Sequence, residues 1–377
     1  MSLMDILKRK SKINLFTTPS HAQHFFIFQK FRQWYKYDIS ETDAHNPQSA
    51  LESAQKKASG IYKTKSTHFL TNGSTSGIIA AVLACVRQEI GNGEWKTGEK
   101  AAKQLSSLGA KNVNENHSPF TIHHSPPKVL IWDNAHPSHK NAVELAGATP
   151  IFYEVDKDKD WDIFKEINID TIEKGLKQGC KAVIVTSPTY EGIVSDVKKI
   201  SGLCKKYNAY LIVDEAHGAL YPFCEKLPTS AIYLDADYII QSLHKTAGGI
   251  NPTALLHCNI ELSDGKRETG DENLSTSSHF SPLTSHLAMI STTSPSYPML
   301  ATIEKNINFL NSKRGRKKIL ELIENIEKMK KNLPNCEFYG KNIINLPSPL
   351  DKGNRRSNEA SDPVSEAKRS VKGEGWS

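Results

Sequence analysis

The sequence predicts an α/β protein in which a mostly parallel sheet forms one large domain flanked by helices. The first observation is a set of six apolar runs, at 128–132, 149–155, 181–187, 209–215, 237–243 and 253–258. These runs are continuous rather than alternating, which is typical of strands covered on both faces. The second observation is that helical patterns such as 196–208 lie between several of the runs. Alternation of this kind favours parallel strands joined by crossover helices.

Helical patterns also flank this central region. Residues 50–63 read as a helix, and the next helix begins where Gly73, Ser74 and Thr75 precede a long apolar run. Residues 319–333 carry apolar side chains at helical spacing, so the basic run at 313–318 is interpreted as the polar start of an amphipathic helix. The remaining polar segments are predicted to be loops at about 91–127 and 261–279 and a disordered tail over 346–377.

Composition narrows the function classes. The chain of 377 residues has 38% hydrophobic and 24% charged residues and a net charge of +7. The net charge is the only feature that would suit nucleic-acid binding. Because basic and acidic residues are interspersed along the chain, a solvated surface is the preferred interpretation. Six cysteines lie far apart with no CxxC pair, so no zinc site is predicted and the thiols suit a reducing cytoplasm. No signal peptide and no apolar run of membrane-spanning length is apparent.

Polar and titratable residues follow several predicted strands directly. In a parallel sheet the carboxyl ends of strands meet at one edge, where ligands bind. The residues that follow the strands are His136, Ser187, Asp214, His217, Ser242, His244 and Lys245. Any one of them has an ordinary explanation, since most lysines are solvated and a Gly-Ser-Thr turn is often only a helix cap. Four strand ends that all carry polar or titratable residues together favour a functional site.

These residue types share one use, which is to hold a planar cofactor that carries a phosphate, a ring nitrogen and an aldehyde. Ser74 and Thr75 open a helix and offer an anion cradle. Asp214 supplies a carboxylate for the ring nitrogen, His136 a flat side chain and Lys245 an amine.

The sequence resembles the fold-type I enzymes that use pyridoxal 5′-phosphate, and within them the Orn/Lys/Arg decarboxylase family in its short bacterial or cyanobacterial form. The matching segments are FLTNGSTSGI (69–78), DNAHPSHKNAVELAGATPIFY (133–153), VIVTSPTYEGIVSD (183–196), LIVDEAHGALYPF (211–223), LPTSAIYLDADYIIQSLHKTAGG (227–249) and STTSPSY (291–297). The DEAHGA and QSLHKT pair is the most specific part. The resemblance covers roughly residues 10–335.

The resemblance implies decarboxylation of arginine, lysine or ornithine to an amine, a step towards polyamines, through an external aldimine and a carbanion. Lys245 would hold the cofactor, Asp214 would pair with its ring nitrogen and His136 would stack on the ring. The implied catalytic residues are thus Lys245, His136 and Asp214. The implied cofactor-binding residues are Gly73, Ser74, Thr75, His136, Ser187, Asp214, His217, Ser242, His244 and Lys245.

The resemblance also implies at least a homodimer, with residues 38–47 and 294–297 near the subunit boundary. It divides the chain into an N-terminal arm (1–50), a large cofactor-binding domain (51–300) and a truncated remnant of the small C-terminal domain (301–345). The segment TPSHAQ at 18–23 departs from the family's glycine-containing opening motif, and 91–127 reads as an insertion. Asp38, Glu41 and Asp43 are candidates for recognising a distal cation of the substrate.

Other activities stay open at this stage. Transamination and aldol cleavage use the same kind of cofactor-binding site. Aminotransferases commonly anchor the substrate carboxylate with an arginine, and no such arginine is identified here. A catalytically inactive subunit of the same fold is the alternative from a different class.

Overall fold

The structure is a computed structural model that describes residues 2–10, 37, 50–89, 126–260 and 282–333. The predicted loops at 91–127 and 261–279 fall almost wholly outside these residues, as do the predicted tail at 346–377 and the acidic candidates at 38–43. The predicted division into arm, large domain and remnant stays a prediction.

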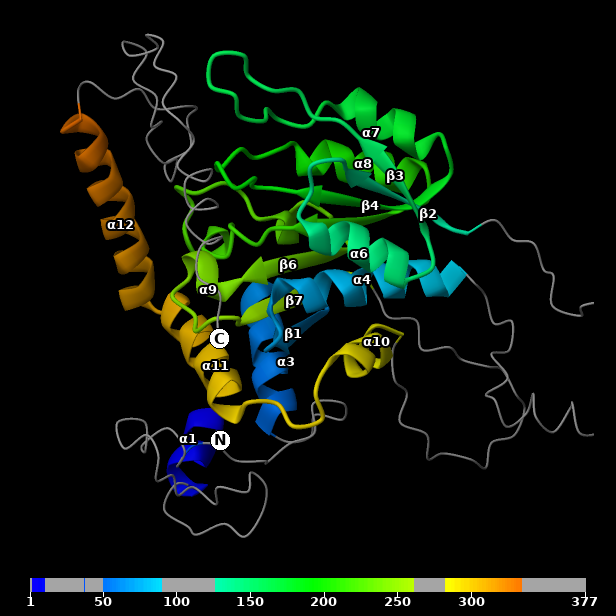
Figure 1. Cartoon of the computed structure of the whole chain (residues 1–377). Coiled ribbons are helices and arrows are strands. Elements are labelled where there is room, and N and C mark those ends of the chain that lie inside the picture. The colour runs from blue at the N-terminus through cyan, green and yellow to red at the C-terminus, as the bar shows by residue number, and fades with distance from the viewer. Residues whose placement is uncertain (1, 11–36, 38–49, 90–125, 261–281, 334–377) are drawn as a thin grey trace, which may run out of the picture.

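A seven-stranded sheet forms the centre of the described chain, with strand order β1-β7-β6-β5-β4-β2-β3 (Figure 1). Six strands run parallel to one another, and β7 runs antiparallel between β1 and β6. The strands are β1 (Ser66–Leu70), β2 (Lys128–Trp132), β3 (Thr149–Tyr153), β4 (Cys180–Thr186), β5 (Tyr210–Asp214), β6 (Tyr238–Ser242) and β7 (Ala254–Cys258). The predicted α/β class with a mostly parallel sheet is therefore confirmed, and each of the six predicted apolar runs overlaps a strand.

Strand β1 was not predicted, because its sequence STHFL is short and half polar. It exists because β7 offers a free edge: Leu70 pairs with Ala254 and Ser66 with Cys258. This pairing brings the carboxyl end of β1 to the same edge as the carboxyl end of β6.

Helices cover both faces of the sheet, as continuous apolar strands require. One face packs against α4 (Gly73–Glu89), α6 (Pro137–Leu145) and α10 (Pro282–Ile290). The other face packs against α3 (Ala50–Tyr62), α7 (Ile169–Leu176), α8 (Val197–Lys206) and α11 (Tyr297–Leu310). Short helices α9 (Leu243–Thr246), η2 (Tyr221–Phe223) and η3 (Ala231–Tyr233) lie in the connections.

Helix α4 lies unusually close to the sheet. A Cβ atom placed on Gly77 would stand 2.8 Å from Leu70 Cδ1 and 3.2 Å from the side chain of Ile240. Only glycine fits this approach without displacing the strand side chains. The close contact brings the first turn of α4 against the carboxyl ends of β1 and β6.

Segments from the two ends of the described chain pack together. Helix α1 (Leu3–Lys10) contacts α11, and the backbone N–H of Leu3 donates to Glu304 Oε2 at 2.9 Å. Helix α12 (Lys313–Lys331) begins in the basic run and buries Ile319 and Ile323, so the predicted amphipathic helix is confirmed (Figure 1). In the described residues, none of the helices combines the length and apolar character that crossing a membrane requires.

Candidate active site

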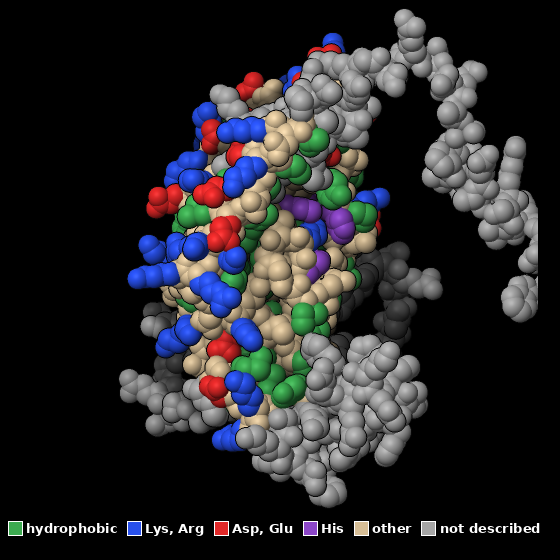
Figure 2. Space-filling view, turned by 90° about the vertical axis from the view of Figure 1, so that its left-hand side faces the viewer, with side chains coloured by type: hydrophobic (Ala, Val, Ile, Leu, Met, Phe, Trp, Pro, Cys, Tyr) green, Lys and Arg blue, Asp and Glu red, His purple; other side chains and the backbone are tan. Residues whose placement is uncertain are grey.

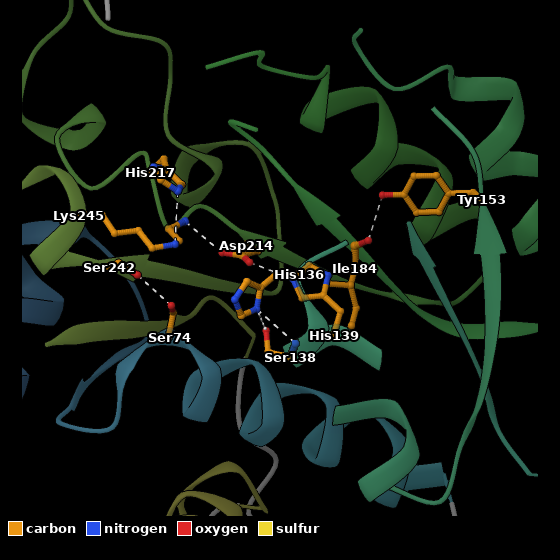
Figure 3. Close-up of polar contacts among 11 residues, drawn as sticks. Ser74, His136, Ser138, His139, Tyr153, Ile184, Asp214, His217, Ser242 and Lys245 are labelled. Carbon is orange, nitrogen blue, oxygen red and sulfur yellow. Dashed lines mark hydrogen bonds and ion pairs between the residues drawn. The ribbon is translucent and has the colours of Figure 1, made fainter. Parts of the chain in front are cut away.

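The candidate site lies at the edge of the sheet where β1, β2, β4, β5 and β6 end. Asp214 is the last residue of β5 and Ser242 the last residue of β6. Lys245 follows β6 within α9, and His136 follows β2. The structure therefore brings together side chains from three separate segments of the chain (Figure 3).

Lys245 and His217 face one another at this edge. Lys245 Nζ lies 3.3 Å from His217 Nε2, within hydrogen-bonding distance. Burial, followed by the positive charge of Lys245, lowers the pKa of His217. His217 is therefore neutral at pH 7, and its free lone pair accepts a hydrogen bond from the amine. Lys245 itself remains exposed in the single chain.

Asp214 is a buried carboxylate with both oxygens engaged. Its Oδ2 lies 2.9 Å from His139 Nε2, and its Oδ1 accepts a hydrogen bond from the backbone N–H of Ala216 at 3.1 Å. Burial is the largest influence and acts to raise the pKa of Asp214. The contact with His139, the charge of Lys245 and the Ala216 N–H outweigh it, so the pKa is lowered. Asp214 therefore carries a negative charge in the interior.

His136 caps α6 and is held by that helix. Its Nδ1 accepts a hydrogen bond from the backbone N–H of Ser138 at 3.2 Å and lies 2.8 Å from Ser138 Oγ. The next residue, Pro137, takes the first helical position, where a missing N–H costs nothing. Burial lowers the pKa of His136 although Asp214 acts to raise it. The ring is neutral and fixed in orientation beside Asp214 (Figure 3).

The start of α4 forms a polar cradle with the end of β6. Ser74 Oγ lies 2.9 Å from Ser242 Oγ, and Thr75 is exposed beside them. Gly73 has a φ of +74°, a conformation that favours glycine at the turn into α4. The first N–H groups of a helix have no partner within it, so hydroxyls and N–H groups point at the same place.

Two predicted residues make their side-chain contacts elsewhere. Ser187 Oγ accepts a hydrogen bond from the backbone N–H of Ser195 at 3.1 Å, within the loop that follows β4. His244 Nδ1 lies 3.0 Å from the carbonyl oxygen of Thr253, in the connection that leads to β7. Both residues lie at the predicted edge of the sheet, and their predicted contacts with a cofactor stay a prediction.

The structure adds two residues that the sequence analysis did not select. His139 is completely buried beside Asp214, and its only signal in the sequence is a second histidine three positions after His136. Tyr190 is 77% exposed, and its ring lies nearly perpendicular to the ring of His217 with centroids 5.5 Å apart. The face of the molecule seen in Figure 2 shows histidine side chains gathered beside hydrophobic and basic ones, while Lys and Arg side chains crowd the flank.

The donor set fits pyridoxal phosphate. Lys245 offers an amine, Asp214 an ionised buried carboxylate, and His136 a flat ring. The Ser74 and Ser242 hydroxyls and the start of α4 offer an anion site. All of these groups lie on one edge of the sheet, as a single small cofactor requires.

Comparisons with known proteins agree with this assignment. The family model described as Orn/Lys/Arg decarboxylase, major domain, matches residues 120–347, which is more than half of the chain. An arginine decarboxylase of Halalkalibacterium halodurans is 28% identical over 264 residues, covering 70% of this chain and 43% of that protein. The chain spans about half the length of the curated relatives it matches.

Two solved structures show the same fold. Lysine decarboxylase A from Pseudomonas aeruginosa superposes with a TM-score of 0.66 at 16% identity, covering 88% of this chain and 43% of that one. A serine palmitoyltransferase from S. paucimobilis with a bound PLP–myriocin aldimine has a TM-score of 0.53 at 12% identity, covering 82% of this chain and 65% of that one. The fold is thus that of fold-type I enzymes.

Proposed function

We propose that this chain, which belongs to the Orn/Lys/Arg decarboxylase family, removes the α-carboxyl group of a basic amino acid with the help of pyridoxal phosphate. The observation that carries the proposal is the pairing of Lys245 with neutral His217 beside ionised Asp214, at the edge of a fold-type I sheet. Arginine, lysine and ornithine are the proposed substrates, in line with the names of the relatives.

When bound, pyridoxal phosphate supplies a ring that accepts the electron pair left behind as CO₂ departs. Lys245 would bind its aldehyde, Asp214 its ring nitrogen and His136 its face. Ser74, Thr75 and Ser242 would bind the phosphate together with the free N–H groups of α4.

Asp214 acts through its negative charge. Its carboxylate is ionised in a buried place, so it favours a proton on whichever base lies against it. The low dielectric of the interior strengthens this effect relative to water.

Lys245 and His217 act by moving a proton. An amine must lose its proton before it can attack a carbonyl carbon, and His217 Nε2 is a neutral acceptor 3.3 Å from Lys245 Nζ. After CO₂ leaves, the reacting carbon needs a proton in return. The Lys245 and His217 pair is the source that we assign, because its two nitrogens already share one.

We also propose a homodimer in the cytoplasm. Lys245 and Thr75 are exposed in the single chain, and Tyr190 is 77% exposed beside them, so a second copy would exclude water from this edge. The cysteines of the described residues are free, which suits a reducing compartment. Light scattering on the purified protein would test the dimer; a fully active monomer contradicts it.

The experiment that tests the function is an absorbance titration of the purified protein with pyridoxal phosphate, before and after borohydride. We expect a visible band that borohydride removes, with the pyridoxyl mass found on the peptide that contains Lys245. The Lys245→Ala variant should show no such band, whereas Lys174→Ala, which removes a lysine from α7, should match the wild type.

Release of CO₂ is then measured with each of the three amino acids. An amine product supports decarboxylation, whereas a keto acid or an aldehyde as the product overturns it in favour of another reaction of the same cofactor. A folded wild-type protein that shows no band overturns the proposal altogether.

A further inference from the structure

We propose that His139 is a positioning residue that orients the Asp214 carboxylate towards the cofactor ring and preserves its negative charge. This inference rests on the proposed function and assigns a role to a buried histidine that is not among the residues proposed to hold the cofactor. The argument depends on the contacts of His139, on its protonation and on the helix that carries it.

The contact geometry leaves Asp214 no freedom to rotate. His139 Nε2 meets Oδ2 at 2.9 Å, and the backbone N–H of Ala216 meets Oδ1 at 3.1 Å. The His139 side chain is fully buried, so water cannot replace this donor. Two donors on two different oxygens fix the plane of the carboxylate.

The other ring nitrogen of His139 indicates the protonation state. His139 Nδ1 is buried and has no hydrogen-bond partner among the described residues. A doubly protonated ring would leave an N–H donor without a partner in the interior, which is costly. A neutral ring with its proton on Nε2 leaves only a lone pair unpartnered. From this geometry we assign His139 a neutral ring that donates a hydrogen bond to Asp214 without cancelling its charge.

The placement of His139 follows from the first turn of α6. His136 is the N-cap of this helix, and the backbone N–H of His139 bonds to the carbonyl oxygen of His136 at 2.9 Å. Residues three apart on a helix share a face, so both imidazoles point into the same edge of the sheet (Figure 3). The first turn of α6 thus places the ring of His136 next to His139, the hydrogen-bond partner of Asp214.

The test compares two substitutions, only one of which can donate a hydrogen bond to Asp214. In His139→Gln the side-chain amide can still donate to Asp214, whereas His139→Leu keeps bulk but offers no donor. Tyr153→Phe is the matched control, because it removes one buried hydrogen bond, to the carbonyl oxygen of Ile184, away from Lys245 (Figure 3). Each variant is titrated with pyridoxal phosphate, and its dissociation constant and the pH dependence of its absorbance band are recorded.

We expect His139→Leu to weaken pyridoxal phosphate binding about 10-fold or more, the loss expected for one hydrogen bond to a charged group. Its band should also titrate at a lower pH than in the wild type. Without the His139 hydrogen bond the Asp214 carboxylate is less well oriented, so it should stabilise the proton on the ring nitrogen less strongly. His139→Gln should restore binding to within about 3-fold, and Tyr153→Phe should match the wild type.

Equal binding and an unchanged band in folded His139→Leu would overturn the inference while leaving the proposed function intact. A wild-type protein that binds no pyridoxal phosphate would overturn the proposed function, and this inference with it. The ¹⁵N imidazole spectrum of the wild type decides the matter if the leucine variant does not fold. The His139 signal, identified by its loss in His139→Gln, should show a proton on Nε2 alone, and a proton on Nδ1 would refute the inference.

Discussion

Asp214 and Glu215 are neighbours in the chain, and both are buried, yet they lie in opposite environments. Asp214 contacts His139 of α6 on one face of the sheet. Glu215 accepts hydrogen bonds from Ser230 Oγ, the backbone N–H of Ala231 and Gln241 Nε2, on the other face. Successive side chains of an extended strand point to opposite faces, so one step along the chain changes every partner.

The two carboxyl groups have pKa values shifted in opposite directions. Burial raises the pKa of Glu215 from 4.5 to about 7, although three donors act to lower it. Burial acts on Asp214 in the same direction, but His139 and the positive charge of Lys245 prevail and its pKa falls. Three hydrogen-bond donors do not offset burial at Glu215, whereas at Asp214 the His139 contact and the Lys245 ammonium group together do.

Glu215 belongs to a polar row beneath the site rather than to the site itself. Gln241 Oε1 lies 3.2 Å from His257 Nε2, and His257 Nδ1 lies 2.9 Å from Thr67 Oγ1. The row links the end of β5 to β6, β7 and β1. We interpret it as support for the strands whose ends carry the candidate site residues.

The largest expected effect comes from removing the charge of Asp214. Asp214→Asn keeps the shape of the side chain but cannot hold a proton on the ring nitrogen. If the proposed function holds, decarboxylation should fall about 100-fold or more, the loss typical of removing one preorganised electrostatic group. The assay is CO₂ release at saturating pyridoxal phosphate, with Asp235→Asn on the surface as the control. Near wild-type activity in Asp214→Asn would break the proposed contrast between the two carboxylates.

The next effect concerns stability and pH at Glu215. Because its pKa in the folded chain lies above that of the unfolded chain, the folded state holds a proton that the unfolded state releases between pH 4.5 and about 7. The contribution of Glu215 to the free energy of unfolding is therefore fully present below pH 4.5. It is lost as the pH rises to about 7, and the total loss is roughly 3 kcal/mol.

Glu215→Gln imitates the protonated form and should flatten this slope. The measurement is the urea midpoint of both proteins at several pH values between 5 and 8. Parallel curves for the wild type and the variant would show that Glu215 does not titrate in this range. Asp214 has the opposite sign, since its lowered pKa makes its contribution present above pH 3.8 and lost only as the pH falls further.

A smaller effect is expected from His257, which lies at the centre of the polar row. Burial lowers its pKa to about 3, so it is neutral throughout the range used for Glu215. His257→Leu removes one hydrogen-bond partner from Thr67 Oγ1 and one from Gln241 Oε1 and should destabilise the fold by about 1–3 kcal/mol. This loss should be the same at pH 5 and pH 8, as determined by urea unfolding. A loss that depends on pH would indicate that His257 titrates together with Glu215.

The smallest effect is expected at the surface. Asp235 lies 2.7 Å from Lys198 Nζ and 2.9 Å from Lys205 Nζ, and its pKa is lowered to about 2 by these contacts. Because its side chain is 47% exposed, solvent screens both ion pairs. Asp235→Asn should therefore change the free energy of unfolding by less than about 1 kcal/mol, the more so because asparagine tolerates its φ of +61°. A larger change in thermal unfolding would contradict the contrast between surface and interior.

The parallel sheet and the edge that holds the site were predictable from the sequence. A strand covered on both faces must be apolar throughout, and that property is local to each run. The residues after 132, 214 and 242 were predictable for the same reason, because in a parallel sheet the strand ends meet wherever the helices pack.

Partners between distant segments depended on the tertiary structure. His139 and Asp214 stand 75 positions apart, and only the packing of α6 against the sheet brings them to 2.9 Å. Strand β1 exists through its pairing with β7, and Ser187 and His244 found partners within their own loops. A hydrogen bond depends on the positions of both atoms, whereas a sequence pattern describes the preference of one segment at a time. The charge of Asp214 and the raised pKa of Glu215 are therefore properties of the folded chain.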